Sequence, residues 1–237
     1  MTDDKSTKLT ILITGGSSGI GKAIALEMAK EGHNFYLTGR NEEKLQQAAN
    51  QIDELDCEVY FSAGDVANET DVERIYQDAE DRLGEIDVLV ASAGVGFFGN
   101  LEDLTIDQYD SQMDVNVRGV FLWLKKVLPK MKERRKGQVI VISSNLGLKT
   151  ASRCSIYAAT KHAVQAMVSC LREELKGTMV KAATINPGSV DTPWFDGKEV
   201  DRTKMLSAED VAKAARIIID QSESSNIDHI LLLPGKI

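Results

Sequence analysis

Two kinds of segment alternate along the whole chain. Short apolar runs rich in β-branched residues, several of them unbroken by polar positions (VLVA, VIVI, ILLL), are typical of strands buried on both faces of a parallel sheet. Longer stretches with apolar residues at helical spacing separate these runs. This alternation predicts an α/β domain in which helices cover both faces of one sheet. We expect strands at 9–14, 34–38, 58–62, 88–91, 139–143, 181–186 and 229–233, and helices at 20–30, 42–55, 71–83, 106–132, 155–175 and 208–220.

No low-complexity tract, repeat or Pro/Ser-rich linker interrupts this alternation, so residues 1–237 are predicted to form a single domain. The least regular stretch, 188–206, combines Gly, Pro, aromatic and charged residues. It follows a predicted strand, which is where ligand sites tend to lie in α/β proteins. We interpret it as a short substrate lid, and an ordinary long connection is the alternative.

Composition and charge narrow the possible partners. Of the 237 residues, 43% are hydrophobic and 27% are charged, as in ordinary folded proteins. The 28 Lys and Arg against 36 Asp and Glu give a net charge of −8, which argues against nucleic acid or an anionic membrane as a partner. No run approaches the roughly 18 apolar residues of a membrane span, and the acidic, polar N-terminus differs from a signal peptide. The three histidines lie far apart in sequence, so we predict no metal site. An odd number of cysteines favours a reducing, cytoplasmic location: Cys57, Cys154 and Cys170.

The first predicted strand runs directly into the glycine-rich turn TGGSSGIG, residues 14–21, and then into a helix. Such a turn lets the backbone approach a pyrophosphate, while the unpaired N–H groups and the dipole at the helix start favour its negative charge. We assign Gly15 to the turn, Gly19 to the close approach and Gly21 to helix packing. Glycines also close ordinary strand-to-helix turns, so this motif does not decide the function by itself.

Four further motifs follow in a fixed order. They are Asn116 in MDVNVRG, Ser144 at the end of a predicted strand, YAATK at 157–161 on a predicted helix, and NPGSVDT at 186–192 after a strand. With these motifs and the GxxxGxG spacing of the turn, the chain resembles the classical short-chain dehydrogenase/reductase family. The resemblance implies an NAD(P)-binding domain of the Rossmann type, with a doubly wound, mostly parallel seven-stranded sheet. It also implies a homodimer or homotetramer.

The residue types in these motifs suit a reaction that moves a hydride and a proton together. A free phenol titrates near about pH 10, so Tyr157 needs help to act as an acid or base at neutral pH. Lys161 lies one helical turn further on, where its ammonium can lower the pKa of Tyr157 and reach a cofactor ribose. Ser144 would hydrogen-bond the substrate oxygen, and the resemblance implies that Asn116 holds a water in a proton relay to Lys161. Each residue alone could serve packing or capping, but their joint order favours catalysis.

Arg40 and Asn41 follow the second predicted strand, with no carboxylate before Glu42. A 2′-phosphate needs a cation there, whereas NAD sites usually place a carboxylate, so we expect NADP rather than NAD. A surface cation at a helix start is the alternative interpretation of Arg40. Where the family often has NNAG, this chain has ASAG at 91–94, so the contacts usually made by the first amide must be made otherwise. The resemblance assigns the remaining cofactor contacts to Ser17, Ser18, Gly19, Ile20, Gly21, Asp65, Val66, Ser92, Ala93, Gly94, Tyr157, Lys161, Pro187, Gly188, Val190 and Thr192.

The sequence therefore predicts an NADP-dependent oxidoreductase that transfers a hydride between the nicotinamide and a small-molecule carbonyl or secondary alcohol, with Tyr157 as general acid/base. The alternative is a catalytically inert dinucleotide-sensing or regulatory protein of the same fold, for which we would expect an incomplete Ser, Tyr and Lys set. The substrate itself is open. An apolar pocket wall is predicted from Phe97, Phe98, Leu146, Cys154, Trp194 and Phe195.

Overall fold

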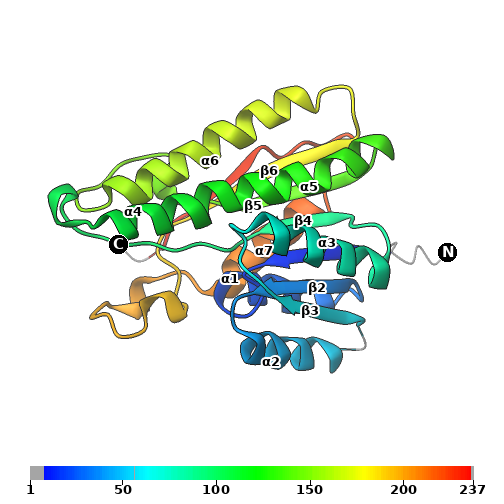
Figure 1. Cartoon of the computed structure of the whole chain (residues 1–237), viewed down its shortest axis with the longest axis horizontal. Helices are drawn as coiled ribbons and strands as arrows, with labels where there is room; N and C mark the ends of the chain where they lie inside the picture. Colours follow the sequence, from blue (N-terminus) through cyan, green and yellow to red (C-terminus); the bar gives the residue numbers. More distant parts are fainter. Residues whose placement is uncertain (1–7, 56, 236–237) are drawn as a thin grey trace.

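The computed structural model describes residues 8–55 and 57–235. Their strands form one seven-stranded sheet in the order β3-β2-β1-β4-β5-β6-β7, and every neighbouring pair is parallel (Figure 1). The predicted doubly wound α/β fold is confirmed, with a sheet that is parallel throughout. Each strand lies within two residues of its predicted bounds: β1 Thr10–Thr14, β2 Asn34–Gly39, β3 Val59–Ala63, β4 Val88–Ala91, β5 Gly137–Ile142, β6 Val180–Pro187 and β7 His229–Leu232.

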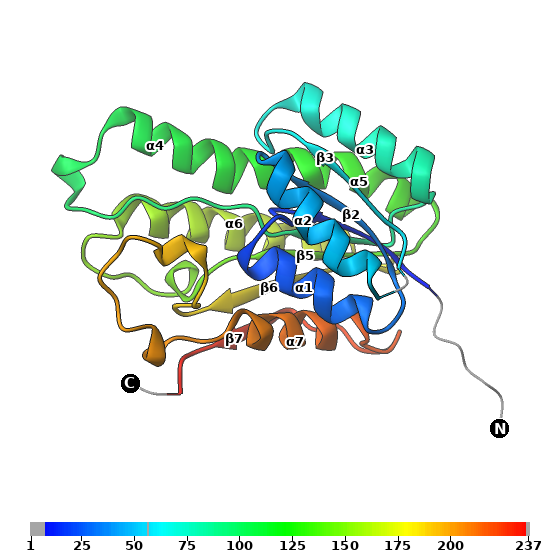
Figure 2. The same ribbon diagram turned by 90° about the horizontal axis from the view of Figure 1, so that it is seen from below.

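Helices cover both faces of the sheet (Figures 1 and 2). One apolar core joins α1, α2 and α7 to the sheet, and a second core on the opposite face involves α3, α5 and α6. The unbroken apolar strands follow from this arrangement because side chains on both faces of the sheet are buried. None of the helices within 8–55 and 57–235 combines the length and apolarity that crossing a bilayer requires. The helices are α1 Gly19–Ala29, α2 Glu42–Asp53, α3 Glu69–Leu83, α4 Ile106–Met113, α5 Gly119–Glu133, α6 Ser155–Glu174 and α7 Ala208–Ile219.

The order of the strands places a crevice at the carboxyl ends of β1 and β4. The chain builds outward from β1 through β2 to β3 and then crosses back to β4 on the other side of β1. The helices that leave β1 and β4 therefore diverge to opposite faces, which opens the crevice in which α/β proteins bind ligands. All motifs singled out in the sequence at strand ends meet along this edge.

The stretch 106–132 is not the single helix that its spacing predicts. It divides into α4, a π-helical turn over Asp114–Arg118, and α5. Asn116 lies in the π-helical turn and is 1% exposed. A widened turn re-aims side chains without ending the helix, and single π turns inside helices often occur at functional sites. Apolar periodicity alone does not reveal such a turn because the helix continues on both sides of it.

Segment 188–206 has structure of its own, with short 3-10 turns at Pro193–Phe195 and Arg202–Lys204. A bridge between Val190 and Leu206 brings its two ends together. The Arg202 guanidinium also ties two parts of the segment, because it contacts the carboxylates of Asp191 and Asp196, each at 2.7 Å. Figure 2 shows this segment in gold and orange beyond the carboxyl end of β6.

Candidate active site

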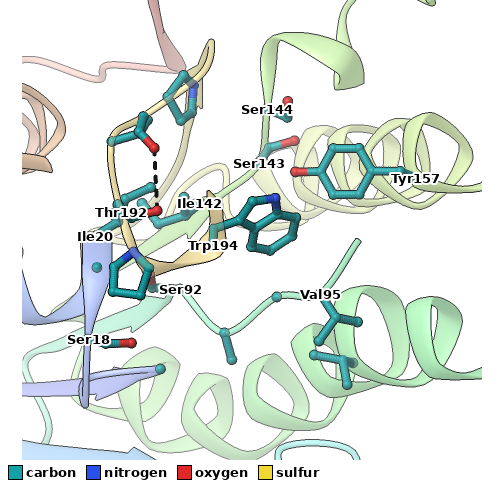
Figure 3. Close-up of a pocket in the computed structure, with 18 of the residues that line it drawn as sticks. Ser18, Ile20, Ser92, Val95, Ile142, Ser143, Ser144, Tyr157, Thr192 and Trp194 are labelled. Carbon is teal, nitrogen blue, oxygen red and sulfur yellow. Dashed lines mark hydrogen bonds between the residues drawn. The ribbon is translucent and has the colours of Figure 1, made fainter. Parts of the chain in front are cut away.

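A cavity of about 640 Å³ opens at the carboxyl ends of the strands and holds most of the residues singled out in the sequence (Figure 3). Three of the predicted catalytic and cofactor-binding residues do not line it: Gly21, Asn41 and Asn116. The predicted catalytic and cofactor-binding residues that line it are Gly15, Ser17, Ser18, Gly19, Ile20, Arg40, Asp65, Val66, Ser92, Ala93, Gly94, Ser144, Tyr157, Lys161, Pro187, Gly188, Val190 and Thr192. The motifs that the sequence separates by up to about 180 residues therefore surround one cavity.

The glycine turn has no room for a side chain at Gly15 or Gly21. Gly15 has φ +67°, and a Cβ there would lie 2.9 Å from the backbone N and Cα of Ala93. Gly19 also has a positive φ, +54°, a conformation that favours glycine. A Cβ at Gly21 would lie 2.4 Å from the Gly15 carbonyl oxygen, so Gly21 packs the helix against the turn. The Ser18 side chain makes no capping hydrogen bond to α1, which leaves the first N–H groups of that helix without a side-chain cap.

The threonine at the end of β1 holds the beginning of the loop that follows β4. Its Oγ1 accepts hydrogen bonds from the N–H groups of Ser92 at 3.1 Å and Ala93 at 3.2 Å. Thr14 thus supplies a contact between these two strand ends that is independent of an amide side chain.

Asn116 clamps the same loop from the opposite side. Its Oδ1 accepts from the Val95 N–H at 2.9 Å, while its Nδ2 donates to the Val95 carbonyl at 2.8 Å and to Thr160 Oγ1 at 3.1 Å. A Cβ on Gly94 would lie 3.4 Å from Asn116 Oδ1 and 3.8 Å from Lys161 Nζ. The side chain of Asn116 is therefore occupied by protein partners, next to the cavity rather than in its wall.

Tyr157 and Ser144 lie next to each other in the cavity wall. In Figure 3 the Tyr157 hydroxyl points toward Ser143 and Ser144 at the end of β5. Burial raises the pKa of Tyr157 to about 12, although a hydrogen bond with Ser144 acts in the opposite direction. The Ser144 hydroxyl also accepts from the N–H of Leu146 at 3.1 Å, which fixes its position. The phenol is therefore protonated at neutral pH in this structure.

Lys161 lies one turn after Tyr157 on α6 and is 5% exposed. Its Nζ donates to the Ile142 carbonyl at 3.0 Å and lies 5.7 Å from the centroid of the Tyr157 ring. Burial lowers the pKa of Lys161 to about 8. The expected lowering of the Tyr157 pKa by Lys161 is not what the structure shows. The ammonium donates to a carbonyl rather than to the phenol, so burial decides the direction in which the pKa of the phenol shifts.

At the other end of the cavity, Arg40 is exposed and has no hydrogen-bond or salt-bridge partner within residues 8–55 and 57–235. Asn41 turns away from the cavity because its Oδ1 accepts from the N–H of Lys44 at 2.8 Å and caps α2. The Asp65 carboxylate accepts from the Ala67 N–H at 2.9 Å, which stabilises the turn after β3. Of these residues, Arg40 alone has a side chain without a hydrogen bond to the described part of the protein.

Aromatic rings surround the tyrosine. Phe98 and Trp194 have ring centroids 5.3 Å and 5.9 Å from the Tyr157 ring. Of the predicted apolar wall, Phe97 does not line the cavity, whereas the other five residues do. Several lining residues were not predicted: Gly39, Gly64, Val95, Val115, Ile142, Ser143, Asn145, Ser189 and Pro193. Most of them are immediate neighbours of predicted residues, which is the signal that could have identified them.

Comparisons with known proteins agree with this geometry. A curated relative, an uncharacterized oxidoreductase of Staphylococcus aureus strain MW2, is 35% identical over 223 residues, which are 94% of this chain and 96% of the relative. Among solved structures, an alcohol dehydrogenase of the archaeon Thermococcus sibiricus in complex with 5-hydroxy-NADP superimposes with a TM-score of 0.91 at 28% identity, covering 97% of this chain and 98% of that one.

A second solved structure is 3-ketoacyl-(acyl-carrier-protein) reductase of Brucella melitensis in complex with NADH. It gives a TM-score of 0.90 at 25% identity and covers 96% of this chain and 98% of that one. The family model described as short chain dehydrogenase matches residues 9–203, which include every motif singled out in the sequence. The chain is an oxidoreductase that belongs to the short-chain dehydrogenase family.

Proposed function

We propose that this oxidoreductase transfers a hydride between NADP(H) and the carbonyl carbon of a small ketone or aldehyde, or the corresponding secondary alcohol, with Tyr157 as general acid/base. One observation carries the proposal. The hydroxyl groups of Tyr157 and Ser144 meet beside the buried Lys161 at one end of a cavity whose other end is the glycine turn. A reacting oxygen next to both hydroxyls would thus lie in the same cavity as the dinucleotide.

The residues present fit a dinucleotide. The glycine turn and the start of α1 would hold the pyrophosphate, since side chains at Gly15 and Gly21 would collide with backbone and the first helical N–H groups lack a side-chain cap. Ser92, Ala93 and Gly94 would hold the nicotinamide ribose, together with Tyr157 and Lys161. The turn from Pro187 to Thr192 would border the nicotinamide. When bound, the nicotinamide supplies or accepts the hydride, which no side chain can do.

The preference for NADP over NAD rests on Arg40. Its guanidinium is exposed at the cavity wall and lacks a carboxylate partner among the described residues, so it is available to a 2′-phosphate. The Ser17 hydroxyl lies nearby, because a Cβ on Gly39 would be 3.2 Å from Ser17 Oγ. Together they would provide a cation and a hydrogen-bond donor for the phosphate.

Three side chains would manage the proton. In the direction of reduction, Tyr157 donates its phenolic proton to the substrate oxygen, and a pKa of about 12 keeps that proton in place at neutral pH. Ser144 donates a hydrogen bond to the same oxygen and orients it. Lys161 places its ammonium 5.7 Å from the centroid of the phenol ring, where its charge offsets part of the cost that burial imposes on the phenolate that remains. Asn116 acts indirectly by fixing Val95 and the loop next to Gly94.

Other features of the proposal concern the whole protein. Residues 1–237 would act as one domain, with segment 188–206 as a substrate lid whose ends are joined by the bridge of Val190 with Leu206. The cytoplasmic location and the homodimer or homotetramer stay predictions. Both fit an oxidoreductase that acts on small molecules.

A turnover assay tests the proposal. Purified protein is mixed with NADPH and a panel of ketones, aldehydes and quinones, and the loss of NADPH absorbance is followed. We expect turnover of at least one carbonyl compound, abolished in Tyr157→Phe. Tight NADPH binding without turnover of any panel member would instead favour the dinucleotide-sensing protein.

A further inference from the structure

Lys198 lies among three aromatic rings that line the cavity. Its Nζ is 5.5 Å from the ring centroid of Phe98, 5.7 Å from that of Trp194 and 5.5 Å from that of Phe195. Phe98 belongs to the loop after β4, whereas Trp194, Phe195 and Lys198 belong to segment 188–206. The ammonium therefore bridges two walls of the cavity that come from different parts of the chain.

The same rings connect Lys198 to the reacting hydroxyl. Phe98 and Trp194 contact both Lys198 on one side and the Tyr157 ring on the other. Figure 3 shows Trp194 beside Tyr157 within the cavity. A substrate whose carbonyl oxygen meets Tyr157 would place its apolar body against these rings. A polar group at its outer end would then approach Lys198.

The ammonium of Lys198 is not paired with the carboxylates around it. The carboxylates of Asp191 and Asp196 are both engaged by Arg202. Lys198 has no carboxylate partner within 8–55 and 57–235, and its side chain is exposed. Asp65 is the one carboxylate among the residues that line the cavity, and it follows β3 at the opposite edge of the sheet from β6 and β7. The aromatic end of the cavity thus has an ammonium resting on its rings and no carboxylate among its described lining residues.

We propose that Lys198 is a specificity-determining residue that binds a carboxylate on the substrate. The proposal rests on the proposed function and deepens it, since it narrows the substrate class to apolar or aromatic ketones that carry a carboxylate at the end remote from the carbonyl. An ammonium that rests on aromatic faces keeps its charge, so it can pair with a carboxylate without giving up the rings. A carboxylate bound there gains a charge-assisted hydrogen bond in a partly desolvated site.

A matched pair of ketones tests this role. Acetophenone and 4-acetylbenzoate present the same carbonyl and ring, and they differ in one carboxylate. We expect Lys198→Met to lower kcat/KM for 4-acetylbenzoate by about tenfold, mainly through KM, and to change kcat/KM for acetophenone by less than about twofold. Lys198→Arg restores the cation and should recover most of the loss. Lys204→Met is the control, because Lys204 is also exposed on segment 188–206 but does not contact the aromatic rings.

Salt and ligand binding give independent measurements. Added KCl should raise the KM for 4-acetylbenzoate in the wild-type protein and should leave it unchanged in Lys198→Met. Benzoate should quench the fluorescence of Trp194 and bind more weakly to Lys198→Met, whereas neutral benzamide should bind both proteins equally. The other tryptophan, Trp123, is buried away from the cavity wall and serves as a constant background.

The outcomes separate this inference from the function on which it rests. An equal loss of kcat/KM on both ketones would overturn it, because Lys198 would then only hold segment 188–206 against the rings. No change on either ketone would overturn it as well. If the carbonyl panel gives no turnover at all, the proposed function fails, and the benzoate titration still decides whether Lys198 binds a carboxylate.

Discussion

The ammonium of Lys161 donates a hydrogen bond to the backbone carbonyl of Ile142, 3.0 Å away, and so ties helix α6 to the end of β5. Lys161 and Tyr157 are one helical turn apart, yet their pKa values shift in opposite directions, to about 8 and about 12. Both shifts have the same cause, because burial disfavours the charged form of each group. The phenol is thus held as an acid, while the lysine remains close to losing its proton.

This relationship predicts a dependence on pH that differs between the two directions of reaction. Reduction needs protonated Tyr157, and a pKa of about 12 keeps it protonated throughout the neutral range, so kcat/KM for a ketone should be constant between about pH 5 and about pH 7, where Lys161 also keeps its proton. Oxidation needs the phenolate, whose fraction grows about tenfold per pH unit below the pKa, so kcat/KM for an alcohol should rise. Pre-steady-state or initial rates over this range measure both. An oxidation rate that stays constant would contradict the assignment of Tyr157 as the base.

Tyr157→Phe removes the proton that the substrate oxygen receives and keeps the ring between Phe98 and Trp194. We expect kcat to fall by about 100-fold or more, as for the loss of a general acid, and the Kd for NADPH to change by less than about twofold. Turnover and fluorescence titration measure the two quantities. Tyr109→Phe, which alters an exposed residue of α4, is the control and should retain full activity. Full activity in Tyr157→Phe would remove the tyrosine from the mechanism.

Arg40→Asp exchanges the unpaired cation at the cavity wall for a carboxylate. The carboxylate should repel a 2′-phosphate and accept hydrogen bonds from a ribose diol, so the ratio of kcat/KM for NADPH over NADH should fall by about tenfold or more. Lys213→Asp makes the same change in net charge on the exposed side of α7, outside the cavity, and should leave the ratio unchanged. Equal ratios in the wild-type protein and Arg40→Asp would make Arg40 a surface cation.

Asn116→Ala removes the clamp on the loop after β4. The Val95 N–H and carbonyl lose their partner in a site where Asn116 is 1% exposed, so the free energy of unfolding should fall by about 2 kcal/mol. Asn50→Ala is the control, since Asn50 is exposed on α2 and its substitution should cost less than about 0.5 kcal/mol. Denaturation in urea compares the two variants. If both lose the same stability, the amide of Asn116 does not support the loop.

Most of the fold and the composition of the candidate site could be predicted from the chain. Strands such as 88–91 were identified because apolar runs flanked by polar turns have few other structures available to them. The π-helical turn around Asn116 could not be predicted, since its periodicity differs from that of an α-helix over a single turn. The contact of Thr14 with Ser92 and Ala93 was also hidden, because a threonine at a strand end has many ordinary roles.

The sequence by itself determined the order of strands and helices, the glycine turn, the residues of the YAATK motif and the family that carries them, because these depend on local spacing and residue type. The tertiary structure decided the electrostatics. The pKa of Tyr157 depends on which atoms surround Tyr157 and Lys161. In the fold, Lys161 donates its hydrogen bond to the Ile142 carbonyl, and burial raises the pKa of the phenol. Only folding brings Phe98 and segment 188–206 together around Lys198, since a contact between residues 100 positions apart leaves no trace in local pattern.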